Sequence, residues 1–159
     1  MAINKSLFSS KSDRWETPDD LFRSLDDRYH FVLDAAADAH NRKCMDYFGP
    51  GSPLAEDALT TDWQPWLEKG NIWLNPPYSR KLQKAFMNKV ISEMKLYWTA
   101  HKHDHGQYNV VCLLPARTDT KIFHEIVKPN ARSVEFLKGR LKFKGAKHGA
   151  PFPSMIVVF

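Results

Sequence analysis

The tetrapeptide formed by Asn75, Pro76, Pro77 and Tyr78 is the most distinctive group of chemically capable residues in this sequence of 159 residues. Two consecutive prolines fix the backbone and supply no amide donors, so a carbonyl there can face a substrate without a competing donor. Asn75 adds a side-chain carbonyl oxygen as a second acceptor. Tyr78 adds a ring that can stack on a planar substrate. A plain turn after a strand is the alternative interpretation of so short a motif.

Two acceptors and an aromatic ring suit methyl transfer to an amine on an aromatic base. The lone pair of such a nitrogen is delocalised into the ring, so the amine is a weak nucleophile. Acceptors that hold its two N–H groups favour a pyramidal nitrogen and stabilise the positive charge that grows as the methyl arrives. A strong base is unnecessary, since the proton becomes acidic once the methyl has transferred. A base inside a duplex must first be flipped out to reach such a pocket.

The residues around the tetrapeptide predict the elements that position it. Residues 71–74 read as a short strand that the two prolines must end, and residues 82–98 carry apolar side chains at helical spacing. A further helix is expected to start near Thr17, which can cap it, with Pro18 in its first turn. The remaining expected elements are strands at 31–33, 110–114, 134–137 and 155–159 and a short helix at 120–127. Strands that alternate with helices indicate an α/β sheet domain over residues 13–159, preceded by a flexible arm at residues 1–12.

Charge is divided unevenly along the chain, whose formal net charge is +5. Residues 13–68 contain 13 acidic and 5 basic residues, whereas residues 69–159 contain 16 basic and 5 acidic residues. This division is typical of a protein that meets a small cationic ligand with one half and a polyanion with the other. Solvated surface charge without a partner is the alternative interpretation.

Composition excludes several other classes of protein. A hydrophobic fraction of 43% is too high for a disordered chain. No apolar run approaches the roughly 18 residues of a membrane span, and the first residues do not resemble a signal peptide. Cys44 and Cys112 form no disulfide framework or metal-ligand spacing, and His101, His103 and His105 fit no structural zinc pattern. We therefore expect a reduced, cytoplasmic protein without a metal or a membrane partner.

Several short segments, in order, resemble the phage-type DNA N6-adenine methyltransferases. They are residues 15–18, 31–37, 61–63, 75–79, 114–120, 139–143 and 150–154. Each segment alone is weak, and the ordered set covers nearly all of the chain beyond the arm. The resemblance implies a compact Rossmann-like class I methyltransferase sheet of reduced size, flanked by helices. It also implies S-adenosyl-L-methionine as cofactor, DNA as partner, and action in a bacterial or phage-infected cell.

The resemblance also implies roles for individual residues. Residues 75–78 would be the catalytic tetrapeptide, with Asn75 near the cofactor as well. Trp15, Thr17 and Pro18 would lie against the methionine part of the cofactor. Asp34 would lie near its amino group and ribose, and Asp62 would mark the adenosyl pocket. Loop or turn carboxylates are the alternatives for both aspartates. One departure is that residues 34–38, Asp-Ala-Ala-Ala-Asp, replace the family's glycine-rich turn.

A basic segment in the second half is the candidate DNA surface. Residues 128–147 contain seven Lys or Arg and one acidic residue, interleaved with aromatic side chains. Solvated lysines on an ordinary surface are the alternative for each member. The residues expected to contact DNA are Ser79, Arg117, Arg140, Lys142 and Lys144.

Two other functions stay open at this stage. A methyltransferase with the same tetrapeptide could act on an RNA base or on a glutamine side chain. A non-catalytic DNA-binding relative could keep the fold without binding the cofactor, and the missing glycine turn supports that reading. The sequence indicates no obligate protein partner, and it leaves the target DNA sequence and the oligomeric state open.

Overall fold

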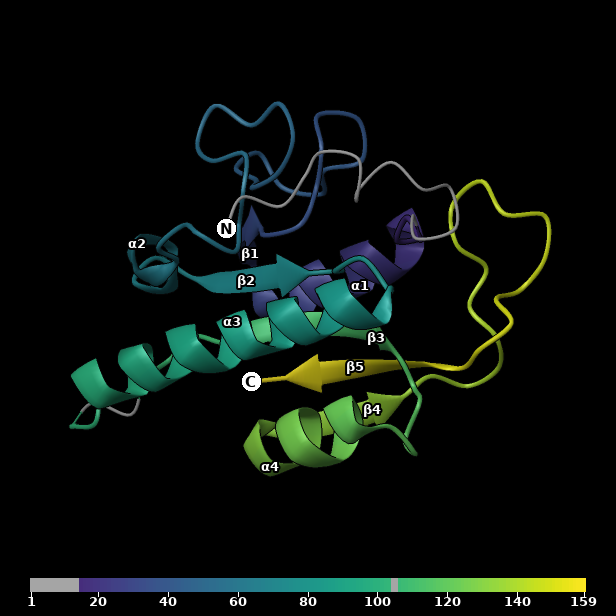
Figure 1. Ribbon diagram of the computed structural model, residues 1–159. Coiled ribbons are helices and arrows are strands. Elements are labelled where there is room, and N and C mark those ends of the chain that lie inside the picture. The colour runs from purple at the N-terminus through teal and green to yellow at the C-terminus, as the bar shows by residue number, and fades with distance from the viewer. Residues whose placement is uncertain (1–14, 104–105) are drawn as a thin grey trace.

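The computed structural model describes residues 15–103 and 106–159, whose five strands form one mixed sheet (Figure 1). The strands are β1 (Phe31–Asp34), β2 (Asn71–Leu74), β3 (Val110–Pro115), β4 (Ser133–Phe136) and β5 (Ser154–Val158). Their order across the sheet is β1-β2-β3-β5-β4. The first three strands are parallel, and β5 runs antiparallel to both of its neighbours. The expected arm at residues 1–12 and His105 lie outside the described residues.

Helices cover both faces of this sheet. The helices are α1 (Asp19–Tyr29), α2 (Gln64–Leu67), α3 (Arg80–Ala100), the π-helix η2 (Ile122–Val127) and α4 (Lys128–Asn130). In Figure 1, α3 and α4 lie in front of the sheet and α1 lies behind it. The α/β class expected from the sequence is therefore confirmed, with a mixed five-stranded sheet.

The two faces of the central strand β3 belong to separate hydrophobic cores. Val110, Cys112 and Leu114 join the core beneath α3, whereas Val111 and Leu113 join the core beneath α1. All six residues of β3 are buried, as expected for a strand between two layers of helices. Burial on both faces fixes the strand register, because a slip of one residue would exchange the two faces.

The expected strands, the long helix and the short helix are confirmed, while one local prediction is wrong. The short helix expected at 120–127 is present as the π-helix η2, Ile122–Val127. Thr17 does not cap α1, because Pro18 occupies the N-cap position and makes no side-chain capping hydrogen bond. The Thr17 hydroxyl instead accepts a hydrogen bond from Asn75, on the neighbouring strand end.

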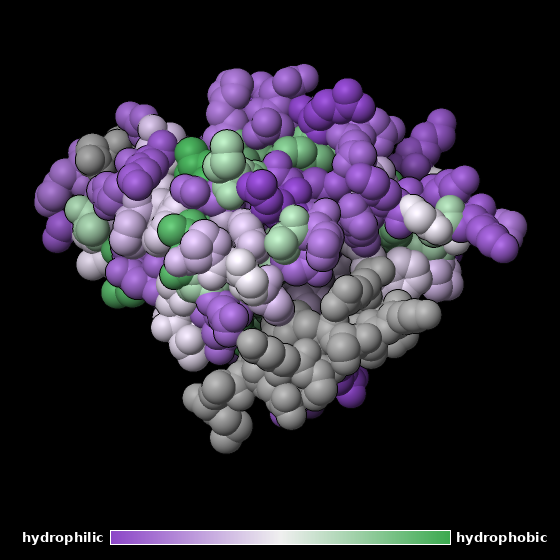
Figure 2. Space-filling model, turned by 90° about the horizontal axis from the view of Figure 1, so that it is seen from above, coloured by the Kyte–Doolittle hydropathy of each residue, from purple (hydrophilic) through white to green (hydrophobic). Residues whose placement is uncertain are grey.

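Few large apolar side chains are exposed on the described part of the surface. Figure 2 shows that the described part of the face seen from above is mainly hydrophilic, with a few apolar side chains between the polar ones. Met45, Leu54, Leu96 and Phe136 are the large apolar side chains exposed in the described chain. Within that same part of the chain, no helix combines the length and hydrophobicity that crossing a membrane requires.

Candidate active site

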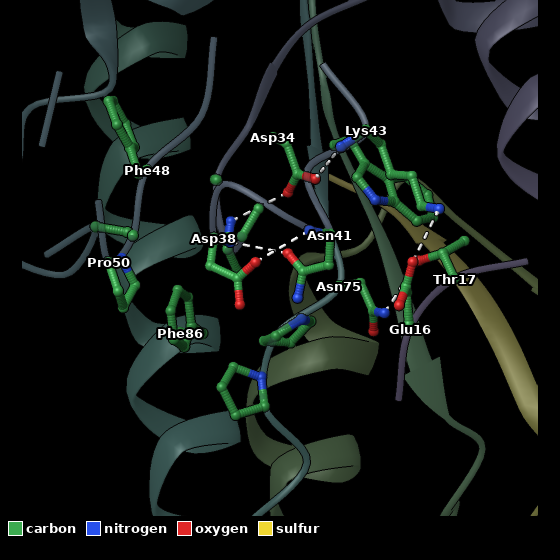
Figure 3. Close-up of a pocket in the computed structure, with 18 of the residues that line it drawn as sticks. Glu16, Thr17, Asp34, Asp38, Asn41, Lys43, Phe48, Pro50, Asn75 and Phe86 are labelled. Atoms are coloured by element: carbon green, nitrogen blue, oxygen red, sulfur yellow. Dashed lines mark hydrogen bonds and ion pairs between the residues drawn. The ribbon is translucent and has the colours of Figure 1, made fainter. Parts of the chain in front are cut away.

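A cavity opens where the parallel strands β1 and β2 end. Asp34 is the last residue of β1, and Asn75 directly follows β2. Ligands of open α/β sheets bind beyond the carboxyl ends of the strands, which is where this cavity lies. It encloses about 900 Å³, including its open mouth. Figure 3 shows Phe48, Pro50 and Phe86 on one side of it and Glu16, Thr17 and Lys43 on the other.

Asp34 is a buried carboxylate on the polar side of the cavity. It is 3% exposed, and its two oxygens accept hydrogen bonds from the backbone amides of Ala36 (3.3 Å) and Lys43 (2.9 Å). Burial raises its pKa to about 6, and the two amide hydrogen bonds only partly oppose this. Asp34 therefore fastens the segment after β1 and also places a titratable charge in the cavity.

The segment after β1 reaches tight packing without a glycine-rich turn. The Ala37 amide donates to the Phe48 carbonyl at 3.0 Å, and the Phe48 amide donates to the Asp34 carbonyl at 2.9 Å. Gly49 then passes so close that an added Cβ would lie 1.8 Å from the Ala37 carbonyl oxygen. The glycine that permits this close approach is thus Gly49, which lies in a later loop, and the alanines after β1 contribute small side chains.

Asn75 is held in one orientation at the strand end. Its Nδ2 donates to the Trp15 carbonyl at 2.6 Å and to the Thr17 hydroxyl at 3.0 Å. Both amide hydrogens are thereby used, so Oδ1 must face away from residues 15–17 (Figure 3). That oxygen is buried and accepts no hydrogen bond from a described residue. A buried acceptor without a donor is uncommon in folded proteins and marks a place where a ligand can donate.

The remaining residues of the tetrapeptide separate into two environments. Pro76 and Pro77 line the cavity beside Asn75. Tyr78 turns away from it, is 5% exposed, and donates its hydroxyl to the Leu113 carbonyl at 3.3 Å. Its ring meets Phe143 and Phe152 edge to face, with centroids 6.1 and 5.6 Å away. Burial raises the pKa of Tyr78 well above its ordinary value, so the phenol stays neutral.

Comparison with known proteins decides the family of this chain. Residues 5–158 match the family described as DNA N-6-adenine-methyltransferase (Dam). The chain belongs to the Dam family. It is also 31% identical over 130 residues to the DNA N-6-adenine-methyltransferase of Escherichia phage T1. The aligned part is 81% of this chain and 46% of the phage protein, so this chain spans about half the length of that relative.

The cavity of this Dam-family chain gathers most of the residues expected to bind the cofactor. Trp15, Thr17, Asp34 and Asn75 all line it. Pro18 lies just outside, before α1. The structure does not bring Asp62 to the cavity: it is exposed and accepts a hydrogen bond from the Gln64 amide at 2.9 Å, beside α2.

Several residues that line the cavity were not expected from the sequence. They are Glu16, Asp38, Asn41, Lys43, Phe48, Gly49, Pro50, Glu56, Ala58, Trp73 and Phe86. Most of them come from residues 38–58, a long connection without regular strands. Sequence spacing alone could not show that Gly49 approaches Ala37 so closely. Phe86 was expected in the core, and it lies there while one side faces the cavity.

The expected DNA contacts of this family member lie in different places. Ser79 precedes α3, and Arg117 follows β3 with its guanidinium 5.5 Å from the centre of the Phe152 ring. Arg140 and Lys142 are exposed on the loop between β4 and β5. Lys144 is already engaged, because its Nζ lies 3.0 Å from Asp19 Oδ2, which raises its pKa.

Proposed function

We propose that this chain methylates the exocyclic N6 amine of adenine in DNA, with S-adenosyl-L-methionine as methyl donor. The observation that carries this proposal is the buried, unpaired Oδ1 of Asn75 at the edge of the cavity. Membership in the Dam family and the similarity to the phage T1 enzyme support it.

The lining of the cavity fits a cationic cofactor with a flat, apolar base. Among the described residues that line the cavity, four are acidic (Glu16, Asp34, Asp38 and Glu56) and one is basic, Lys43, so acidic groups predominate in that part of the lining. The Lys43 ammonium is itself 2.6 Å from Asp19 Oδ1, outside the cavity lining. Opposite charge near a sulfonium and an ammonium group favours their binding.

The apolar side of the cavity fits the flat base of the same cofactor. Phe48, Pro50 and Phe86 form a wall on which a purine ring can pack. S-adenosyl-L-methionine, when bound, supplies an electrophilic methyl group on its sulfonium.

Asn75 performs the central step in this proposal. Its Oδ1 accepts a hydrogen bond from one N–H of the target amine and stabilises the positive charge that develops on that nitrogen. The Pro76 carbonyl, to which no described residue donates a hydrogen bond, is the second acceptor. Trp15 and Thr17 are positioning residues, since they keep the Asn75 amide from rotating. The extra proton on the product nitrogen is then lost to water.

Tyr78 requires a local rearrangement before it can stack on the target base. Its ring is covered by Phe143 and Phe152, both from the segment between β4 and β5. We infer that this segment moves when a flipped adenine enters, exposing the face of the Tyr78 ring. A planar base would then replace the two phenylalanine edges.

The sheet supports a reduced Rossmann-like architecture within one domain, residues 13–159. Its parallel strands β1, β2 and β3 carry the site at their carboxyl ends, as doubly wound sheets do. Action on DNA is consistent with the cytoplasmic location expected above.

Incubation with isotopically labelled cofactor and duplex DNA, followed by nucleoside analysis, tests this proposal. We expect label in N6-methyladenine from the wild-type protein and far less from Asn75→Ala. RNA of the same sequence and a glutamine-containing peptide serve as competing substrates. Label in either of these but not in DNA would support the other methyltransferases considered above. A folded protein that binds no cofactor by calorimetry would support the non-catalytic relative.

A further inference from the structure

A second, basic groove lies between the start of α3 and the segment 117–126. Arg80, Gln83 and Lys84 line it from α3, and Arg117 and Lys121 line it from the other side. Figure 1 shows α3 and the helical segment of η2 and α4 on the same face of the sheet. The groove holds about 1340 Å³, including its open mouth. It is separate from the cavity described above, because the two share no lining residue.

The charges in this groove are not neutralised internally. Arg80, Lys84, Arg117 and Lys121 contribute four positive charges, and two acids, Asp119 and Glu125, line the groove as well. None of the four cations forms an ion pair with a residue in the described ranges. Arg117 is instead steadied by the Phe152 ring below its guanidinium. These cations are therefore available to an anionic partner.

Gln83 is a buried polar side chain at the same groove. It is only 8% exposed, yet its amide group makes no hydrogen bond with any residue of the described chain. Its backbone amide, by contrast, is used and donates to Ser79 at 2.8 Å. The side chain lines the open groove, where its NH₂ group can donate to a bound ligand. A side-chain NH₂ among cations suits an anionic oxygen.

Two residues of the groove lie close in sequence to the tetrapeptide and to the end of β3. Arg80 follows Ser79, the residue after the tetrapeptide, and Arg117 lies two residues beyond the end of β3. The first turn of α3 adds unpaired backbone amides and the positive end of the helix dipole. A strand whose base is extruded toward Asn75 must carry its adjacent phosphates past these residues.

We propose that this groove binds the sugar-phosphate backbone of DNA beside the flipped nucleotide, with Gln83 donating to a phosphate oxygen. The proposal rests on the proposed function and names its DNA-binding surface. It differs from the expectation that the loop between β4 and β5 carries this contact, since Lys144 of that loop is paired with Asp19.

Salt-dependent DNA binding by two double variants tests the groove. The groove variant is Lys84→Gln/Lys121→Gln, and the control variant is Lys95→Gln/Lys102→Gln, which removes two exposed lysines elsewhere on and after α3. Binding of a fluorescent duplex is measured from about 50 to about 200 mM salt, with cofactor affinity as a check on folding. Both variants carry the same net charge, so a general charge effect would alter them equally.

We expect the groove variant to lose about 2 from the slope of log K against log salt, since each phosphate contact contributes about 0.9. The control should keep the wild-type slope, and both should bind the cofactor normally. Equal slopes in the two variants would contradict the binding of DNA by this groove. So would groove-dependent binding that prefers RNA of the same sequence. If the groove variant had a reduced salt slope but the wild-type protein made no N6-methyladenine, DNA binding by the groove would stand and the proposed function would be refuted.

Gln83 is tested by two substitutions of similar size. Gln83→Leu should weaken duplex binding about 3- to 10-fold without changing the salt slope, because it removes one neutral donor. Gln83→Glu should weaken binding further by placing a negative charge beside the phosphate. Cofactor affinity and thermal unfolding should stay close to wild type in both. Wild-type DNA affinity in Gln83→Leu would contradict the hydrogen bond assigned to this residue.

Discussion

Asn75 Nδ2 lies 2.6 Å from the carbonyl oxygen of Trp15, a residue 60 positions earlier in the chain. This contact joins the end of β2 to the segment before α1 and leaves the Asn75 oxygen as the free end of the amide. An amide held in this way needs no reorganisation when a substrate donates to it. Preorganised acceptors of this kind stabilise developing charge more effectively than groups that must first turn.

Replacement of Asn75 by Ala should abolish most of the methyl transfer. We expect the turnover number to fall about 10²- to 10³-fold, as when one preorganised polar group is lost from an active site, while cofactor affinity stays largely intact. Single-turnover assays and calorimetry measure the two quantities separately. Turnover near the wild-type rate would refute the role assigned to Asn75.

Thr17→Val tests whether Thr17 positions Asn75. Valine has a similar shape but cannot accept the 3.0 Å hydrogen bond, so the amide gains freedom to rotate. We expect the turnover number to fall about tenfold with little change in KM, since the loss concerns orientation in the transition state. Thr99→Val, at the exposed end of α3, is the control. A change in KM alone would indicate a binding role for Thr17.

Replacement of Tyr78 separates packing from stacking. Tyr78→Ala should destabilise the fold by about 3–5 kcal/mol, because the ring is buried against Phe143 and Phe152. Tyr78→Phe should lose about 1 kcal/mol through the missing hydrogen bond to Leu113 and should keep part of the activity. Chemical denaturation and turnover report the two effects. If Phe proved no more active than Ala in folded protein, stacking would be the wrong account.

The sequence predicted the parts of the site that depend on strand ends. Asp34 and Asn75 follow short apolar runs, and parallel strands bring their carboxyl ends to one edge of the sheet. The sequence also predicted the α/β class and the long helix after the tetrapeptide. The strands and the long helix could be predicted because hydrophobic periodicity and the effect of proline on the backbone are local, extending over a few residues.

The parts that could not be predicted depend on contacts between distant loops. Gly49 approaches Ala37, and Phe48 exchanges backbone hydrogen bonds with the segment after β1. No periodic pattern encodes such a contact, because the connection at residues 38–58 contains no regular strand. The environment of Tyr78 was hidden for the same reason, since Phe143 and Phe152 reach it from the far end of the chain.

Gly49→Ala should disrupt the cofactor cavity. The added Cβ would lie 1.8 Å from the Ala37 carbonyl oxygen, and the backbone φ of +143° is rarely adopted by other residues. We expect the loop to shift, with cofactor affinity reduced at least about tenfold. Gly51→Ala is the matched control: its φ of +81° carries backbone strain, but an added Cβ there meets nothing within 4 Å. Equal cofactor affinity in the two variants would show that the approach to Ala37 is unimportant.

Asp34 should couple pH to stability and to cofactor binding in opposite directions. Burial raises its pKa from 3.8 to about 6, so between these values the folded protein holds a proton that the unfolded chain has lost. The contribution of Asp34 to the free energy of unfolding is therefore fully present below about pH 4 and decreases as pH rises through about 6. The shift corresponds to about 3 kcal/mol.

Cofactor affinity should instead rise as pH increases through about 6, because the ionised Asp34 carboxylate attracts a cationic ligand. Calorimetric titration and thermal unfolding between about pH 4 and pH 8 measure both trends. Asp34→Asn should flatten each of them, whereas Asp27→Asn, an exposed control on α1, should preserve them. If cofactor affinity were independent of pH in the wild type, the Asp34 charge would have no part in binding, and its two backbone hydrogen bonds would be its whole role.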